Sequence, residues 1–304
     1  VGLYISVGYV HIEGLQIRYY ANSSNSASIA IYNNNIHIAD NIIRGDHMLT
    51  SGAQPAKGIY ASNKSGVTVI NNIVYGIIGG DGNAYGIGVM LYNFGAGPYY
   101  AYNNTVYNCA RGFESANKGI LAKNNIAYNN GDNYVSTHHD DSTNNLSGPD
   151  QTDAPGSDPI NGATVIFADE DHDDFRLAPV DTGAIDAGVD LSTDGNYAFT
   201  TDILGNTRPG GTKWDLGAHE SFVLDYVWDG GGSGSNWTTD DNWDCDDDYP
   251  REIWYKVFFN STSVDDCTVD TAATIGYLDI ADAYTGTITL SDDLTVAYEL
   301  TVGA

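Results

Sequence analysis

Two acid-rich stretches contain the side chains best suited to bind a metal ion. The first places Asp169, Asp171, Asp173 and Asp174 close together, and the second lies at 240–248. Carboxylate oxygens are ligands that Ca²⁺ prefers in proteins. Neither stretch has the D-x-[DN]-x-[DN]-G-x₅-E spacing of an EF-hand loop. Calcium bound by these four aspartates is therefore one interpretation, and solvated acidic turns without an ion are the other.

Residues 1–135 offer few side chains for acid–base catalysis on a sugar polymer. Hydrolysis needs two neighbouring carboxylates that act as acid and base. Lyase chemistry needs a strong base to remove the proton next to a uronate, with calcium to acidify that proton. The acids are Glu13, Asp40, Asp46, Asp81, Glu114 and Asp132, and the bases considered are Arg18, Arg44, Arg111, Lys118 and Lys123. None of the acids forms an Asp-Asp pair, so the sequence predicts no catalytic residue and favours solvated charges.

Histidine and tyrosine clusters were considered for metal and sugar binding. In the run His138-His139-Asp140-Asp141 the two histidines would point to opposite faces of a strand and chelate poorly, so we expect a solvated loop. The pairs Tyr19-Tyr20 and Tyr99-Tyr100, with Tyr102, could stack on sugar rings. Packing inside the fold explains the tyrosines as well, and both readings stay open.

The three cysteines predict at most one disulfide. Cys245 and Cys267 are 22 residues apart in an Asp-rich region, and a bond between them would stabilise the fold by about 3 kcal/mol. Two free thiols are the alternative. Cys109 follows a strand-like run and is expected to be buried. No Cys-x-x-Cys pair indicates zinc. N-x-[ST] triplets, which an Asn-rich chain generates by chance, occur at Asn22, Asn63, Asn103, Asn145, Asn236 and Asn260.

The charge of the chain excludes several partners and divides the sequence. Its 304 residues include 40 acidic and 12 basic side chains, for a net charge of -28. Without a basic patch, nucleic acid is not expected as a partner, and anionic membrane surfaces are disfavoured. No apolar run reaches the roughly 18 residues of a membrane span, so no membrane insertion is expected. Residues 1–135 contain six acids and seven bases, whereas residues 136–304 contain 34 and five, which indicates a domain boundary.

A repeated phrase organises the first half of the chain. It reads HIEGLQIRY, HIADNIIRG, VINNIVYGI, AYNNTVYNC and AKNNIAYNN, and it aligns on Gly14, Asn41, Asn72, Asn104 and Asn125. Runs such as ASIAIYNN, AKGIYASN and YGIGVMLYN lie between the phrases and alternate apolar and polar residues, as strands do. Asn tolerates a left-handed backbone at a corner, and its amide can bond to amides stacked above and below. The sequence therefore predicts a parallel β-solenoid with a structural Asn/Gly ladder at these five positions.

The N-N-[IT]-[VA]-Y phrase, with its GIYASN-type strands, resembles the right-handed parallel β-helix superfamily over residues 1–148. That superfamily includes pectate-lyase-like enzymes, phage tailspikes and surface proteins. The resemblance implies the fold but not the activity, because the same scaffold carries lyases, hydrolases, epimerases and inert adhesins. The Asn-Thr-Asp, Gly-His-Gly, Arg-Ile-Lys, Arg-x-Pro-x-x-Arg and Asp-Pro-His phrases of its enzymes are absent.

Residues 149–222 resemble the closing segment that follows many secreted bacterial and archaeal β-helices. Four landmarks occur in order: DFRLAP, GAIDAG, DILGNTRPGG and WDLGAHE. The departure is Val180-Asp181-Thr182-Gly183, where that segment often has Gly-Ser-Pro. The resemblance implies an extracellular β-helix whose open end is covered, and a bare solenoid end would indeed be prone to aggregate.

Residues 223–304 form an acidic, Trp-containing β module. YVWDGGGSGSNWTTDDNWD looks like the beginning of domains found in large bacterial surface and autotransporter-like proteins. The alternating runs of IGYLDIADAYTGTITLSDDLTVAYELTV suggest a second, narrower solenoid, incomplete at its C-terminus.

Taken together, these features predict an all-β chain with a right-handed parallel β-helix at 1–148, a closing segment at 149–222 and the β module at 223–304. We expect an extracellular, cell-surface structural or adhesive protein that is non-catalytic and assembles with other copies of itself into filaments or modular surface chains. The alternatives are a polysaccharide lyase or glycoside hydrolase acting on uronic-acid polymers, and a non-catalytic carbohydrate-binding module. Calcium is the one cofactor considered.

Overall fold

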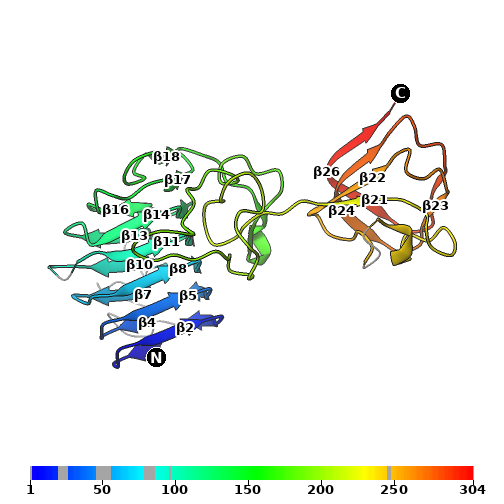
Figure 1. The fold of residues 1–304 in the computed structure, drawn as a ribbon. Coiled ribbons are helices and arrows are strands. Elements are labelled where there is room, and N and C mark those ends of the chain that lie inside the picture. Colours follow the sequence, from blue (N-terminus) through cyan, green and yellow to red (C-terminus); the bar gives the residue numbers. More distant parts are fainter. Residues whose placement is uncertain are drawn as a thin grey trace. The chain divides into compact units, whose positions relative to one another are not determined.

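Short alternating runs fold into strands that stack in three parallel sheets (Figure 1). The computed structural model describes residues 2–19, 27–45, 56–78, 86–95, 97–244 and 248–303. Each of the first five coils contributes one strand to each sheet, and these strands pair with their equivalents in the next coil. The expected all-β parallel solenoid is therefore confirmed.

The sheets are named by the order in which the chain visits them. The first sheet contains β1 (Leu3–Ile5), β4 (Ala27–Ile31), β7 (Ala56–Ser62), β10 (Gly86–Tyr92), β13 (Arg111–Ala116) and β16 (Tyr134–Val135). The second contains β2 (Val10–Glu13), β5 (Ile36–Ala39), β8 (Val67–Ile70), β11 (Tyr99–Tyr102) and β14 (Ile120–Lys123). The third contains β3 (Gln16–Tyr19), β6 (Ile42–Gly45), β9 (Ile73–Tyr75), β12 (Thr105–Tyr107), β15 (Ile126–Tyr128), β17 (Leu146–Gly148) and β18 (Ile160–Asn161).

Inward-facing side chains of the three sheets make one continuous core. In the first sheet Ile29, Ile59, Val89 and Phe113 pair across successive coils and are fully buried. Because alternate residues of a strand point to opposite faces, this register leaves the residues between them on the outer face.

Residues 163–221, here called the flank segment, have little regular structure beyond one antiparallel hairpin. The hairpin consists of β19 (Phe167–Asp169), the 3₁₀ turn η1 (Glu170–His172) and β20 (Asp174–Leu177). Phe167 and Phe175 pack on Tyr107 of the third sheet, with ring centroids 5.8 and 4.9 Å away.

The chain divides into two compact units, of which the first comprises residues 1–177 and 181–221 and the second residues 178–180 and 222–304. The second contains β21 (Leu224–Val227), the 3₁₀ turn η2 (Asp240–Asn242), β22 (Tyr255–Phe259), β23 (Cys267–Val269), β24 (Ala273–Ile280), β25 (Ile288–Leu290) and β26 (Leu294–Val302). Its sheets, β21-β22-β24-β26 and β23-β25, are parallel. Parallel pairing of strands from successive turns of the chain is again solenoid architecture, built around the buried Trp228, Trp237 and Trp243.

Across the described part of the chain, the structure contains no helix with the length and apolar character needed to span a membrane.

Candidate functional site

A buried asparagine ladder runs along the corner between the second and third sheets. Asn41, Asn72, Asn104 and Asn125 are fully buried, and Asn145 continues the row. The Oδ1 of Asn104 accepts hydrogen bonds from the backbone N–H and the Nδ2 of Asn72, both at 3.0 Å, and the same pair of bonds repeats from coil to coil. The ladder satisfies buried amides that would otherwise lack partners, so its role is structural.

Gly14 does not belong to this ladder. Gln16 pairs with Ile42, so Leu15 stands opposite Asn41, and the N–H of Leu15 donates to Asn41 Oδ1 at 3.0 Å. Gly14 instead begins the neighbouring row of left-handed corner residues, with φ of 69°. The sequence interpretation assigned the left-handed corner and the amide ladder to one residue, whereas each Asn-Asn pair divides them between its two members.

The left-handed corner row attaches the flank segment to the solenoid. It contains Asn71, Asn103, Asn124 and Asn144, with φ between 49° and 55°. Their Nδ2 groups donate to the carbonyls of Thr201, Asp215, Val189 and Ala187 at 2.8–3.0 Å. Four consecutive coils therefore hold the flank segment against the corner. The flank segment was expected to cover an open end of the solenoid. The residues bonded by the corner row instead lie along its side, because the outward amides of that row provide hydrogen-bond donors on successive coils.

The charged landmark residues of the flank segment hold its own backbone together. The fully buried Arg208 and Glu220 form an ion pair at 2.6 Å. Arg208 also donates to the carbonyls of Gly217 and Ala218, at 3.0 and 3.1 Å. Burial raises the pKa of Glu220, and the Arg208 charge opposes that effect. A buried pair that satisfies this many backbone groups is suited to fixing the loop path rather than to catalysis.

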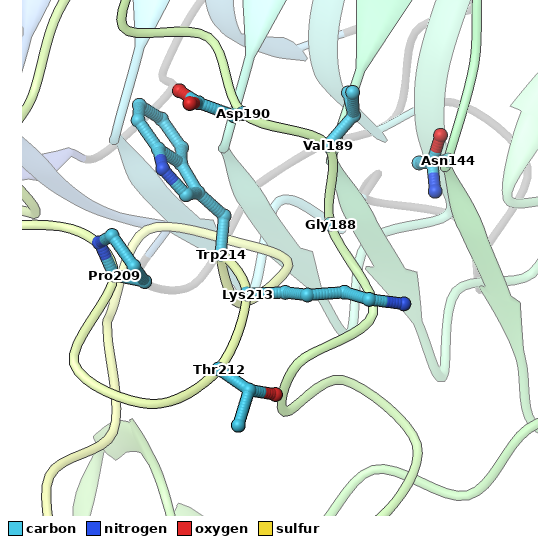
Figure 2. Close-up of a pocket in the computed structure, with 8 residues that line it drawn as sticks. All are labelled: Asn144, Gly188, Val189, Asp190, Pro209, Thr212, Lys213 and Trp214. Atoms are coloured by element: carbon cyan, nitrogen blue, oxygen red, sulfur yellow. The ribbon is translucent and has the colours of Figure 1, made fainter.

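A hollow of about 370 Å³ lies within this segment, and Figure 2 shows its lining around Lys213 and Trp214. Trp214 is almost fully buried, and its ring contacts Arg208 at 5.5 Å and Phe199 at 5.2 Å. Asn144, at the rim, is bonded to Ala187. Trp214 and Asn144, which line the hollow, therefore already hold the flank segment in place.

The four aspartates considered for calcium do not form one donor group. Asp169 binds His172 at 2.8 Å, Asp174 binds Arg176 at 2.6 Å, and Asp173 pairs with Arg44. In the described parts of the chain, no group of three or more His, Cys, Asp or Glu side chains is arranged to hold a metal ion. The geometry therefore gives the calcium hypothesis no support at these residues.

The remaining predicted residues lie in different surroundings. Cys267 is buried, whereas Cys245 falls outside the described residues, so their disulfide stays a prediction. His138 is buried against Tyr134, with ring centroids 5.5 Å apart, which corrects the expectation of a solvated loop for this residue, whereas Asp140 and Asp141 are exposed. Tyr99 and Tyr102 are fully buried, so packing explains them. Tyr20 and the side chain of Tyr19 lie outside the described part.

An exposed aromatic row occupies the outer face of the first sheet. We call it the tyrosine strip, and it consists of Tyr4, Tyr32, Tyr60 and Tyr92, one from each of four successive coils. Tyr4 and Tyr32 are 61% and 43% exposed, and Tyr60 and Tyr92 are half-buried. The rings of Tyr4 and Tyr32 stack with centroids 4.4 Å apart, and Tyr60 follows at 6.3 Å from Tyr32.

The strip follows directly from the strand alternation. Ile29, Ile31, Ile59 and Leu91 point into the core, so the neighbouring tyrosines point outward. The quoted runs ASIAIYNN, AKGIYASN and YGIGVMLYN each contain one of them. The signal was therefore present in the sequence, but attention to adjacent tyrosines missed a row that forms only when coils stack.

Polar side chains border the strip. The Tyr92 hydroxyl donates to the buried Glu114, which also pairs with Arg111 at 2.8 Å. Burial and the Glu114 carboxylate raise the pKa of Tyr92, which keeps its hydroxyl protonated. The Lys57 ammonium lies 5.2 Å from the Tyr60 ring centroid, a cation–π distance. Lys57 and Glu114 are themselves buried, so they hold the rings of Tyr60 and Tyr92 in place beneath the strip.

Comparisons with known proteins found no matching family model, no matching curated protein and no matching solved structure.

Proposed function

We propose that this chain is an extracellular, non-catalytic structural or adhesive module that binds carbohydrate through the tyrosine strip. The observation that carries the proposal is the row of outward tyrosines, one per coil, on a rigid sheet. The sequence resemblance to the right-handed β-helix superfamily and to autotransporter-like surface modules supports a cell-surface location.

The spacing of the strip suits an extended polymer. Strands of adjacent coils lie about 4.8 Å apart. Tyr4 and Tyr60 both pair with Ala30, whereas Tyr92 pairs with Ser62, so the tyrosines alternate between two register positions as they follow one another along the axis. The apolar faces of β-linked neutral sugars pack on aromatic rings, and exposed tyrosine hydroxyls bind sugar hydroxyls. Because the sheet is built before the ligand arrives, little conformational entropy is lost on binding.

Affinity electrophoresis and calorimetry with soluble neutral β-glucans test this proposal. Tyr4→Ala and Tyr32→Ala should each weaken binding about tenfold, which corresponds to about 1.4 kcal/mol. Tyr9→Ala is the matched control, because Tyr9 is 85% exposed and lies in the turn before β2 rather than on the first sheet. Equal loss in the control, or no loss in either strip variant, would contradict the proposal.

Self-association is a second candidate function, favoured by the strand edges. Among the described strands, β26 ends its sheet, and it exposes Leu300 and Val302. Such an edge can pair with a strand of another copy.

Sedimentation velocity and electron microscopy of the purified chain test self-association. Leu300→Lys and Val302→Lys should reduce assembly, whereas Val264→Lys, at an exposed loop position, should not. Repeating the experiment with a chelator tests whether calcium takes part. Monomers at every concentration would exclude this second function.

A further inference from the structure

A hollow on the outer face of the third sheet gathers two arginines. It has a volume of about 410 Å³, and its lining includes Arg18, Arg44, Tyr75 and Asp173. This volume lies in the range of small-ligand sites. The hollow is separate from the tyrosine strip, which belongs to the first sheet.

The strand register places the arginines side by side. Arg18 pairs with Arg44 between β3 and β6, and Arg44 pairs with Tyr75 between β6 and β9. Like charges directly opposite each other on neighbouring strands are destabilising. Two guanidinium groups one coil apart therefore favour anionic partners, and Asp173 is one such partner of Arg44.

One carboxylate already reaches the hollow. Asp173, the residue that ends η1, pairs with Arg44, and the Arg44 guanidinium also lies 5.9 Å from the Tyr75 ring centroid. The lining thus contains two guanidinium groups and one carboxylate. The excess of guanidinium groups favours oxyanions at this hollow, although the net charge of the chain is -28.

We propose that this hollow binds the oxyanion of an acidic glycan, a carboxylate or a sulfate ester, with Arg18 and Arg44 as its ligands. Guanidinium groups bind planar carboxylates through two parallel hydrogen bonds and also bind sulfate oxygens. Asp173 competes with the ligand for Arg44 and therefore sets the affinity. This inference rests on the proposed carbohydrate-binding function but uses different residues.

Calorimetry with a polyuronate, a sulfated glycan and a neutral β-glucan tests the site. Arg18→Gln and Arg44→Gln should each lower affinity for the acidic polymers at least tenfold, and binding should weaken as salt rises. Asp173→Asn should increase affinity several-fold, because Asn accepts the left-handed backbone of that position, with its φ of 66°, and removes the competing charge. The acidic polymer that binds with the higher affinity identifies the oxyanion, which is a carboxylate for the polyuronate and a sulfate ester for the sulfated glycan.

Arg176→Gln is the matched control. It removes the same charge from the hairpin that carries Asp173, but Arg176 pairs with Asp174 and does not line the hollow. Circular dichroism checks the fold of every variant, and Asp173→Asn tests the proposal even if Arg44→Gln fails to fold. The site would be overturned if neither Arg18→Gln nor Asp173→Asn changed the affinity for acidic polymers. It would also be overturned if Arg176→Gln lowered that affinity as much as the two arginine substitutions in the hollow. If the protein binds the neutral β-glucan but neither acidic polymer, this inference fails and the proposed function stands. If the strip variants lose binding of the neutral β-glucan, this inference is unaffected.

Discussion

At the scale of single residues, the asparagine pairs show how one residue type can perform two tasks. The first member of each pair accepts a left-handed backbone and points its amide outward, as Asn103 does. The second member, such as Asn104, is buried and bonds to the coils on both sides. Neither task involves a reacting group, so the most repeated polar residue of this chain serves the architecture.

Replacing a ladder residue should destabilise the first unit. Asn104→Ala leaves the buried N–H of Asn72 without its acceptor, which we expect to cost about 2–3 kcal/mol. Chemical denaturation measures the change. Asn34→Ala, at an exposed position, should shift stability by no more than about 0.5 kcal/mol. Equal effects of the two substitutions would refute the role of the ladder.

His219 should make stability depend on pH. Its Nδ1 accepts the Leu177 N–H at 3.1 Å, which requires a neutral ring, and burial lowers the pKa of His219 to about 4. The unfolded chain, with an ordinary His pKa of about 6.5, binds this proton first, so stability falls as pH drops from about 6.5 to about 4.

His219→Asn isolates this contribution, because the Asn Oδ1 can accept the same hydrogen bond but does not titrate. The difference in unfolding free energy between wild type and variant should change across that pH window and be constant above it. A difference that is independent of pH would rule out this assignment.

At the scale of elements, the solenoid and the flank segment depend on one row of amides. The flank segment has little secondary structure of its own, so its path is set by contacts with the left-handed corner row and by the Arg208–Glu220 pair. The same segment carries Asp173 to the arginine hollow. If the flank segment detached from the corner row, the arginine hollow would therefore lose the position of Asp173.

Asn124→Gly should loosen the flank segment without straining the corner. Glycine adopts the φ of 55° but lacks the amide that bonds both backbone groups of Val189. We expect a loss of about 1–3 kcal/mol and faster hydrogen exchange at Val189. Asn129→Gly, at an exposed corner with a similar φ of 56°, should leave exchange at Val189 unchanged. Protection of Val189 equal to that of wild type would contradict the attachment.

At the scale of the whole molecule, each of the two units has a hydrophobic core of its own. The first core lines the coils, whereas the second gathers Trp228, Trp237 and Trp243 around Phe259. The rings of Trp237 and Trp243 meet at 4.7 Å, and each indole N–H donates to a carbonyl. Each unit therefore has the packing needed for its own cooperative unfolding.

Calorimetry should resolve two transitions that respond to different substitutions. Trp243→Ala should destabilise the second unit by about 3–5 kcal/mol and leave the first transition in place. Asn104→Ala should shift only the first transition. A single transition moved by both substitutions would contradict independent folding.

The all-β solenoid could be predicted from the sequence, because the period-2 alternation and the Asn phrase are local and repeat with each coil. The sequence also located most of the ladder, and it missed the register at Gly14 because a one-residue shift is settled only by pairing with the next coil. The tertiary structure alone decided the surfaces. Tyr4 and Tyr32, or Arg18 and Arg44, lie 28 and 26 residues apart in the sequence. They become neighbours because coils stack on one another: Arg18 pairs directly with Arg44, and the ring of Tyr4 reaches Tyr32 diagonally. A binding surface on a solenoid consists of such contacts between coils.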